Sequence, residues 1–249
     1  MTLARASSLA LAAAAGALSV FAFAPFGWSG LIFVTLALLS WQWQRAASAR
    51  DAAWDGFAFG AGLFGAGSSW LTVALVNFGG MPTWLAAIAI AILTAYLALW
   101  PALAGYVTVR LTPTHSVPRL LVAAGAFTGA EWIRSYLFTG FPWLALGYTQ
   151  VPDGIARGFA PIGGVYLVTL AVALGAGLVA WFADALADRS RLRTAGSAVK
   201  SPSSTSPSRA LAVRMSDSST WSGTSSENTG KALSGSTIRR PRLCRTSER

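Results

Sequence analysis

Two opposite charges lie three residues apart inside an apolar stretch, at Glu131 and Arg134. Residues at this spacing share one face of a helix, so the carboxylate and the guanidinium can point together into a protein interior. A charge at membrane depth costs roughly 2.5–3.5 kcal/mol on insertion scales, so such a pair is expected to neutralise itself or to line a polar cavity. The pattern therefore suggests a place where a charged group, such as a lipid headgroup, is held.

An aromatic loop, Thr139 to Trp143, follows the charged pair. Pro142 has no backbone N–H and restricts Phe141, so no helix continues through this segment. Trp143 and Tyr148 are residue types that suit the headgroup layer of a membrane. The candidate lipid-binding residues are Glu131, Arg134, Gly140, Phe141, Pro142, Trp143 and Tyr148. The alternative is an ordinary belt of interfacial aromatic residues beside an ion pair that only fixes helix packing.

The composition that surrounds these residues is that of a membrane protein. Of 249 residues, 54% are hydrophobic and 11% are charged, against about 25% charged in an ordinary soluble domain. The single cysteine, Cys244, permits no disulfide framework, and the single histidine, His115, excludes a histidine-rich metal site. No metal or other cofactor is expected.

The apolar stretches predict an all-α membrane protein, a bundle of about six transmembrane helices. Ser7 to Phe23 fits a first span better than a signal peptide, because Pro25 would follow the cleavage site and further spans come at once. The six expected spans cover about 7–23, 28–43, 56–78, 84–109, 119–138 and 162–185. Glycines along the third span are expected to let a neighbouring helix approach closely: Gly56, Gly60, Gly62, Gly65 and Gly67.

Arginine placement predicts the orientation of these spans. With a cytoplasmic N-terminus, the cytoplasmic side collects Arg5, Arg45, Arg50, Arg110, Arg119, Arg189, Arg191 and Arg193. The outer loops then hold only Arg157, which agrees with the bias of positive charge towards the cytoplasm. The turn at 77–82 and the aromatic loop at 139–143 are both expected at the outer face.

The chain is expected to divide into a membrane domain, 1–193, and a disordered tail, 194–249. The tail holds 22 Ser and Thr among its 56 residues and shows neither helical nor strand periodicity. Its basic charge alone is weak support for nucleic-acid binding, and no nucleic-acid partner is expected. The abrupt change of composition suggests a frameshift in the coding sequence within about six codons of Thr194, a margin that matches the uncertainty of boundary predictions.

A series of motifs resembles the membrane domain of bacterial apolipoprotein N-acyltransferases over about residues 7–190. They occur in the order 23–26, 60–70, 78–82, 95–97, 131–134 with 137–143, 147–150 and 160–165. The resemblance implies an enzyme of the inner membrane that moves an acyl chain from a phospholipid to the N-terminal amine of a diacylglyceryl-cysteine lipoprotein.

The same resemblance implies nitrilase-type chemistry, with a Glu base, a Lys and a Cys nucleophile in a separate extracytoplasmic domain. Neither Cys244 nor Glu227, Lys200 and Lys231 stands in a matching context, so no catalytic residue is carried over. The chain is therefore expected to be truncated and inactive alone. The alternative is a non-catalytic scaffold for a partner such as a polyprenol-phosphate mannosyltransferase; a transporter would need inverted repeats and broken helices that this sequence does not indicate.

Overall fold

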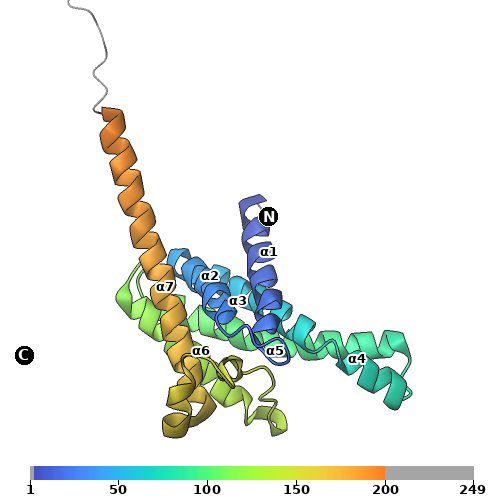
Figure 1. Cartoon of the computed structure of the whole chain (residues 1–249). Coiled ribbons are helices and arrows are strands. Elements are labelled where there is room, and N and C mark those ends of the chain that lie inside the picture. The colour runs from blue at the N-terminus through green and yellow to red at the C-terminus, as the bar shows by residue number, and fades with distance from the viewer. Residues whose placement is uncertain (1–2, 200–249) are drawn as a thin grey trace, which may run out of the picture. The chain divides into compact units, whose positions relative to one another are not determined.

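The computed structural model describes residues 3–199, and within that range it is built from helices without a β-strand (Figure 1). The longer helices are α1 (Leu3–Leu18), α2 (Leu31–Arg45), α3 (Ala49–Gly67), α5 (Thr83–Leu111), α6 (Val117–Arg134) and α7 (Ala160–Val199). Short helical segments are η1 (Ser19–Ala22), α4 (Leu71–Val73), η2 (Ala74–Phe78), η3 (Leu137–Thr139), η4 (Leu146–Gln150) and η5 (Arg157–Phe159). The predicted all-α class is confirmed for these residues.

The number of membrane spans is supported only in part. Three helical segments are long and apolar enough to cross a membrane, namely Arg5–Ala22, Thr83–Leu111 and Arg157–Ala187. A fourth candidate is the pair Ala49–Gly67 and Leu71–Phe78, which is bent by 54°, so the span expected at 56–78 is broken. Helix α2 has only 15 residues, a length of about 22 Å at 1.5 Å per residue, and α6 carries three charges, Arg119, Glu131 and Arg134.

The last helix extends beyond the residue at which the tail is expected to begin. Helix α7 runs to Val199 and so continues past the predicted start of the tail at Thr194. Ala195 and Ala198 are strong helix formers. They favour continuation of the helix although the overall composition changes at this point. The remainder of the predicted tail, 200–249, lies outside the described residues.

Helix starts follow capping signals in the sequence. The Ser48 hydroxyl accepts a hydrogen bond from the Asp51 backbone N–H at 3.1 Å, which caps α3. The Ser116 hydroxyl does the same for α6 through the Arg119 N–H at 3.3 Å, and Pro118 occupies the first turn. These two hydrogen bonds fix the residues at which α3 and α6 begin.

Glycines let α3 pack closely between two neighbouring helices. A Cβ atom added at Gly56 or Gly60 would collide with backbone atoms of α5, and one added at Gly62 would collide with the Ala13 carbonyl of α1. A Cβ at Gly16 of α1 would in turn collide with the Phe59 carbonyl. The predicted close approach is confirmed at Gly56, Gly60 and Gly62, whereas a Cβ at Gly65 would make only an ordinary contact at 3.6 Å and one at Gly67 would meet the Leu144 side chain. Figure 1 shows α3 running beside both α1 and α5.

We expect Gly62→Ala to lower the free energy of unfolding by about 1–3 kcal/mol, because the new methyl group must push α1 away from α3. Gly125→Ala is the matched control. It lies within α6, where an added Cβ meets nothing within 4 Å, so we expect an unchanged or slightly raised melting temperature in detergent. A Gly62→Ala variant as stable as the Gly125→Ala variant would contradict the packing described here.

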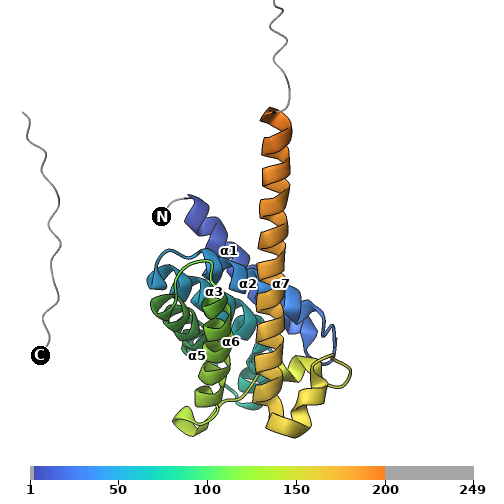
Figure 2. The ribbon, with the colours of Figure 1, turned by 90° about the vertical axis from the view of Figure 1, so that its left-hand side faces the viewer.

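Helix α7 lies against α2 and α6 in the first half of its length (Figure 2). A Cβ at Gly175 would meet the ring of Phe33 on α2, and one at Gly177 would meet Leu120 on α6. Val168, Val172 and Ala176 are buried on the same part of α7. This packing brings α7 next to the end of α6, where Glu131 and Arg134 lie.

Candidate functional site

The aromatic loop begins where α6 ends, at Arg134. Gly140 has a φ angle of +81°, and a Cβ there would collide with the Ser135 carbonyl, so the turn needs a glycine. The Phe141 N–H then donates to the Arg134 carbonyl at 3.3 Å. The chain is thereby folded back over the end of α6, and the helix ends before Pro142 as the sequence predicts.

Arg134 fixes the loop from the inside. Its side chain is 1% exposed, and Nη1 donates to the carbonyls of Phe141 at 3.1 Å and Trp143 at 2.7 Å. The guanidinium carbon lies 5.0 Å from the ring centre of Phe64 on α3, which is within cation–π range. One buried cation thus connects α6, the loop and α3.

Glu131 fixes the segment that follows the loop. Its carboxylate is buried, with Oε1 accepting the Leu146 N–H at 3.0 Å and Oε2 accepting the Thr169 hydroxyl at 2.9 Å. The Thr169 oxygen accepts the Gly147 N–H at 2.9 Å. The carboxylate therefore connects α6 to η4 and to α7. Its two hydrogen bonds are charge-assisted, and the bond from the Gly147 N–H to Thr169 extends this buried hydrogen-bond network.

The two charges attract each other without direct contact. No nitrogen–oxygen distance within 4.0 Å joins Glu131 to Arg134, both of which are among the described residues. A small cavity of about 10 Å³ lies against both side chains and Trp100. Arg134 Nε and Nη2 have no hydrogen-bonding partner within the described part of the chain. The two opposite charges therefore lie near each other in the interior, while Arg134 bonds to the aromatic loop and Glu131 bonds to Leu146 and to Thr169 of α7.

The outer surface of the fixed loop forms one wall of an apolar pocket of about 510 Å³. Phe141, Pro142, Trp143 and Tyr148, four of the predicted site residues, line this pocket, whereas Glu131, Arg134 and Gly140 lie behind it. Trp143 and Tyr148 are about half exposed, at 46% and 49%. The Trp143 ring also contacts Trp70, with 5.5 Å between ring centres. The geometry suits a hydrocarbon chain with a polar group at the rim.

Sequence reasoning did not identify the rest of the pocket lining or the supporting hydroxyl. The remaining lining residues are Phe23, Ala24, Leu144 and Val151. Phe23 and Ala24 belong to one of the motifs named above, but their distance in sequence gave no sign of contact with the loop. Thr169 could have been singled out as a hydroxyl inside an apolar span. Among the described residues, no group of three or more His, Cys, Asp or Glu side chains could hold a metal ion.

Comparison with known proteins gives one consistent result. The family model for the apolipoprotein N-acyltransferase N-terminal domain matches residues 15–178. The chain is 46% identical over 183 residues to an apolipoprotein N-acyltransferase of Nitrosomonas europaea, covering 73% of this chain and 36% of that protein. Proteins of the same name from Chromobacterium violaceum and Methylococcus capsulatus are 41% and 42% identical over 177 and 180 residues, 71% of this chain in both cases and 34% and 35% of those proteins. The chain spans about a third of the length of these relatives.

Proposed function

This chain belongs to the apolipoprotein N-acyltransferase family, and from that premise we propose that its helices hold the lipid substrates of acyl transfer. The pocket beside Phe141 and Trp143 receives an acyl chain of the phospholipid donor or of the diacylglyceryl lipoprotein. The reaction served is transfer of an acyl group from the phospholipid to the N-terminal amine of the lipoprotein. The proposed location is a bacterial inner membrane, with this pocket at the outer face and the N-terminus in the cytoplasm.

The observation that carries the proposal is the pocket of about 510 Å³ that the aromatic loop lines. Its volume is within the usual range of small-molecule sites, roughly 300–1,000 Å³. Its lining is apolar apart from the Tyr148 hydroxyl and the Trp143 indole, both at residues that remain half exposed. An acyl chain would bury its methylene groups there, and the polar end of the lipid would lie at the rim beside the Trp143 and Tyr148 side chains.

The pocket wall is held in place before any lipid arrives. Arg134 holds the carbonyls of Phe141 and Trp143, and Glu131 holds the Leu146 N–H. A wall fixed by buried hydrogen bonds loses little conformational freedom on binding, which favours affinity. In this proposal the charged pair supports the loop, and the aromatic residues contact the lipid.

A chimaera tests the proposal. Residues 1–178 of this chain would replace the matching part of the Nitrosomonas europaea relative, and the product would be expressed in bacteria depleted of their own N-acyltransferase. We expect the chimaera to restore triacylated lipoprotein, measured by mass spectrometry of lipoprotein N-termini. The 249-residue chain alone, following the sequence expectation, is expected not to restore it.

Trp143→Ala in the chimaera is expected to lower the rate of acyl transfer about tenfold, because removing a large aromatic contact weakens binding by about 1–2 kcal/mol. Trp132→Ala is the matched control, since Trp132 is 51% exposed on α6 and does not line the pocket. Equal activity of the two variants would remove the pocket from the proposal. An inactive chimaera, together with stoichiometric co-purification of the 249-residue chain with a polyprenol-phosphate mannosyltransferase, would favour the scaffold alternative.

A further inference from the structure

A second cleft, of about 950 Å³, opens at the other end of α1 from the Phe141–Trp143 pocket. Arg5, Ser8 and Leu11 of α1 line it, whereas Phe23 and Ala24, just beyond η1, line the first pocket. The helical path from Arg5 to Phe23 is about 27 Å at 1.5 Å per residue, close to the roughly 30 Å thickness of a membrane's hydrocarbon core. The two clefts therefore face opposite headgroup layers, and one lipid cannot occupy both.

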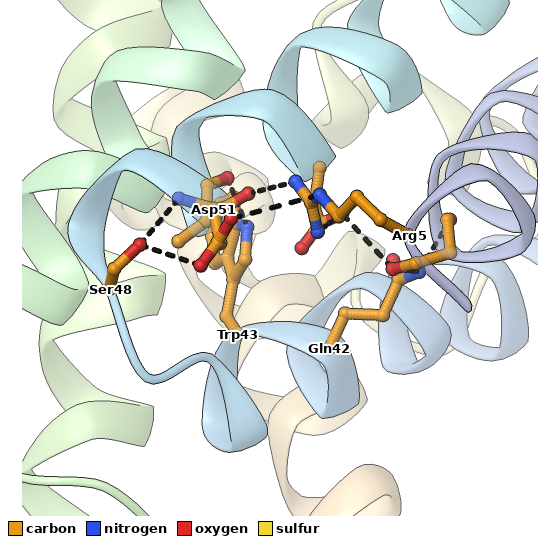
Figure 3. A network of polar contacts seen from close by, with 8 residues as sticks. Arg5, Gln42, Trp43, Ser48 and Asp51 are labelled. Atoms are coloured by element: carbon orange, nitrogen blue, oxygen red, sulfur yellow. Dashed lines mark hydrogen bonds and ion pairs between the residues drawn. The ribbon is translucent and has the colours of Figure 1, made fainter. Parts of the chain in front are cut away.

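The wall of this second cleft is a network of charged and polar side chains. Arg5 Nη1 lies 2.9 Å from Asp55 Oδ1, and Nη2 donates to the Asp51 carbonyl at 2.7 Å (Figure 3). The Gln42 side-chain amide donates to the Ser8 carbonyl at 2.8 Å, which attaches α2 to α1 beside the network. These bonds shape the wall from the start of α1, the end of α2 and the start of α3.

Groups of both signs stay accessible at the rim of the cleft. The Asp51 side chain is 48% exposed, and its nearest cation is Arg5 Nε at 3.7 Å. The Arg45 side chain is 37% exposed and pairs with Asp184 through Nη2 at 2.6 Å. The lining holds two arginines, Arg5 and Arg45, and two aspartates, Asp51 and Asp55. A purely anionic or purely cationic ligand would meet as much repulsion as attraction, whereas a ligand with both charges matches the wall.

The cleft continues from charged to apolar surface. Leu11, which is 41% exposed, lies about 9 Å further along α1 than Arg5 at 1.5 Å per residue, in the direction of the membrane interior. A ligand that fits both parts carries a zwitterionic head and a hydrocarbon tail. Trp41 also lines the cleft, and the Arg45 guanidinium lies over its ring at 4.6 Å, so this arginine already occupies one face of the ring.

We propose that this cleft binds an aminophospholipid, a lipid with one phosphate and one primary ammonium, from the leaflet opposite to the Phe141–Trp143 pocket. The phosphate pairs with the Arg45 guanidinium, and the ammonium donates hydrogen bonds to the Asp51 carboxylate. The acyl chains follow Leu11 towards the membrane interior. This site is independent of acyl transfer, because its evidence is charge balance and position at the far end of α1.

The test measures which lipid the protein retains. The 249-residue protein is reconstituted in vesicles of equal parts dioleoyl phosphatidylethanolamine, phosphatidylcholine and phosphatidylglycerol, extracted in mild detergent and examined by native mass spectrometry. We expect phosphatidylethanolamine to be retained about tenfold over the other two lipids, the discrimination that one charge-assisted hydrogen bond supplies. Equal retention of all three lipids, or preference for phosphatidylglycerol, overturns the proposal.

Matched variants assign the preference to this cleft. Asp51→Asn should abolish the selectivity, and it keeps the cap of α3 because the Ser48 hydroxyl binds the backbone N–H of residue 51. Asp153→Asn removes the same charge at the other end of the molecule, where Asp153 is 86% exposed, and should change nothing. Arg45→Gln, with Arg157→Gln as its control, repeats the comparison for the phosphate contact and serves if Asp51→Asn does not fold.

A final arm separates the lipid from its soluble headgroup. Free phosphoethanolamine at millimolar concentration should not displace the retained lipid, because it lacks the tails that contact the apolar part of the cleft. Displacement would overturn the lipid assignment, as would unchanged selectivity in both Asp51→Asn and Arg45→Gln. The readout is lipid retention, so its outcome does not depend on whether the chimaera transfers acyl groups.

Discussion

Replacing Arg119 with leucine is expected to lower the free energy of unfolding by about 3–5 kcal/mol, enough to remove most folded protein from membranes. The Arg119 side chain is 2% exposed and occupies the point where the C-terminal ends of α2 and α5 meet. Its Nη1 donates to the carbonyls of Trp43, Gln44 and Ala46 at 3.0, 3.2 and 3.1 Å. Its Nη2 and Nε donate to the Thr112 carbonyl at 2.7 Å and the Thr112 hydroxyl at 3.2 Å.

The size of the effect follows from what leucine would leave behind. The last carbonyls of a helix have no partner within that helix, and each buried one left unpaired costs about 1–3 kcal/mol. The two helix ends also carry partial negative charge, which a buried cation offsets. Leucine supplies neither the five donors nor the charge, so we expect the ends of α2 and α5 to separate.

Two further variants make the result interpretable. Arg119→Lys keeps the charge but loses the planar arrangement of donors, and it should fall between the wild type and leucine. Arg110→Leu removes an exposed arginine from the end of α5 and should change the melting temperature in detergent little. If Arg119→Leu melted at the same temperature as Arg110→Leu, the clamp at the helix ends would not contribute to stability.

Arg119 also shows where sequence reasoning reached its limit. The sequence places Arg119 at the start of an apolar segment beside Pro118, and the alternation of arginines across the expected spans assigns it to the cytoplasmic side. The structure buries it, and three of the carbonyls that it binds, those of Trp43, Gln44 and Ala46, come from residues more than seventy positions away. Local composition cannot reveal acceptors that tertiary packing brings together.

Features governed by neighbouring residues were predictable. The long apolar run and the flanking prolines gave α5 to within a few residues, and Gly140 with Pro142 marked the end of the helix before the aromatic loop. The glycines of α3 predicted a close contact between helices, but they did not indicate which neighbouring helix each glycine would face. The 54° bend between Gly67 and Leu71 was missed, since an apolar composition continues through it.

The position of the charged pair was predictable from the sequence, but its hydrogen-bonding partners were not. Spacing placed Glu131 and Arg134 on one buried face of α6, which the structure has. The direct ion pair that this spacing invites is replaced by bonds to Leu146, Phe141 and Trp143, because the loop folds back over the end of the helix. The folding of the loop depends on packing against α3 and α7, and no pattern within the loop reveals it.

Arg134→Ala is expected to lower the yield of folded protein far more than Arg157→Ala. The first change removes the donors that hold the Phe141 and Trp143 carbonyls and leaves the Glu131 charge buried without its neighbouring cation. Breaking such a buried arrangement costs about 3–5 kcal/mol. Arg157 is 61% exposed, and its pair with Asp153 is of the surface kind that contributes about 0–1 kcal/mol.

A double variant separates the two causes of the expected loss. Glu131→Gln removes the buried negative charge while keeping an oxygen that can accept the Leu146 N–H. If the uncompensated charge dominates, Glu131→Gln combined with Arg134→Ala should be more stable than Arg134→Ala alone, with a coupling energy of about 1–3 kcal/mol. If the lost bonds to the loop dominate, the two losses should add, and lipid contacts at Trp143 should weaken in both Arg134→Ala backgrounds. Removing a buried cation with these partners should be costly. Equal folded yields and equal melting temperatures of Arg134→Ala and Arg157→Ala in detergent would therefore contradict the buried arrangement described here.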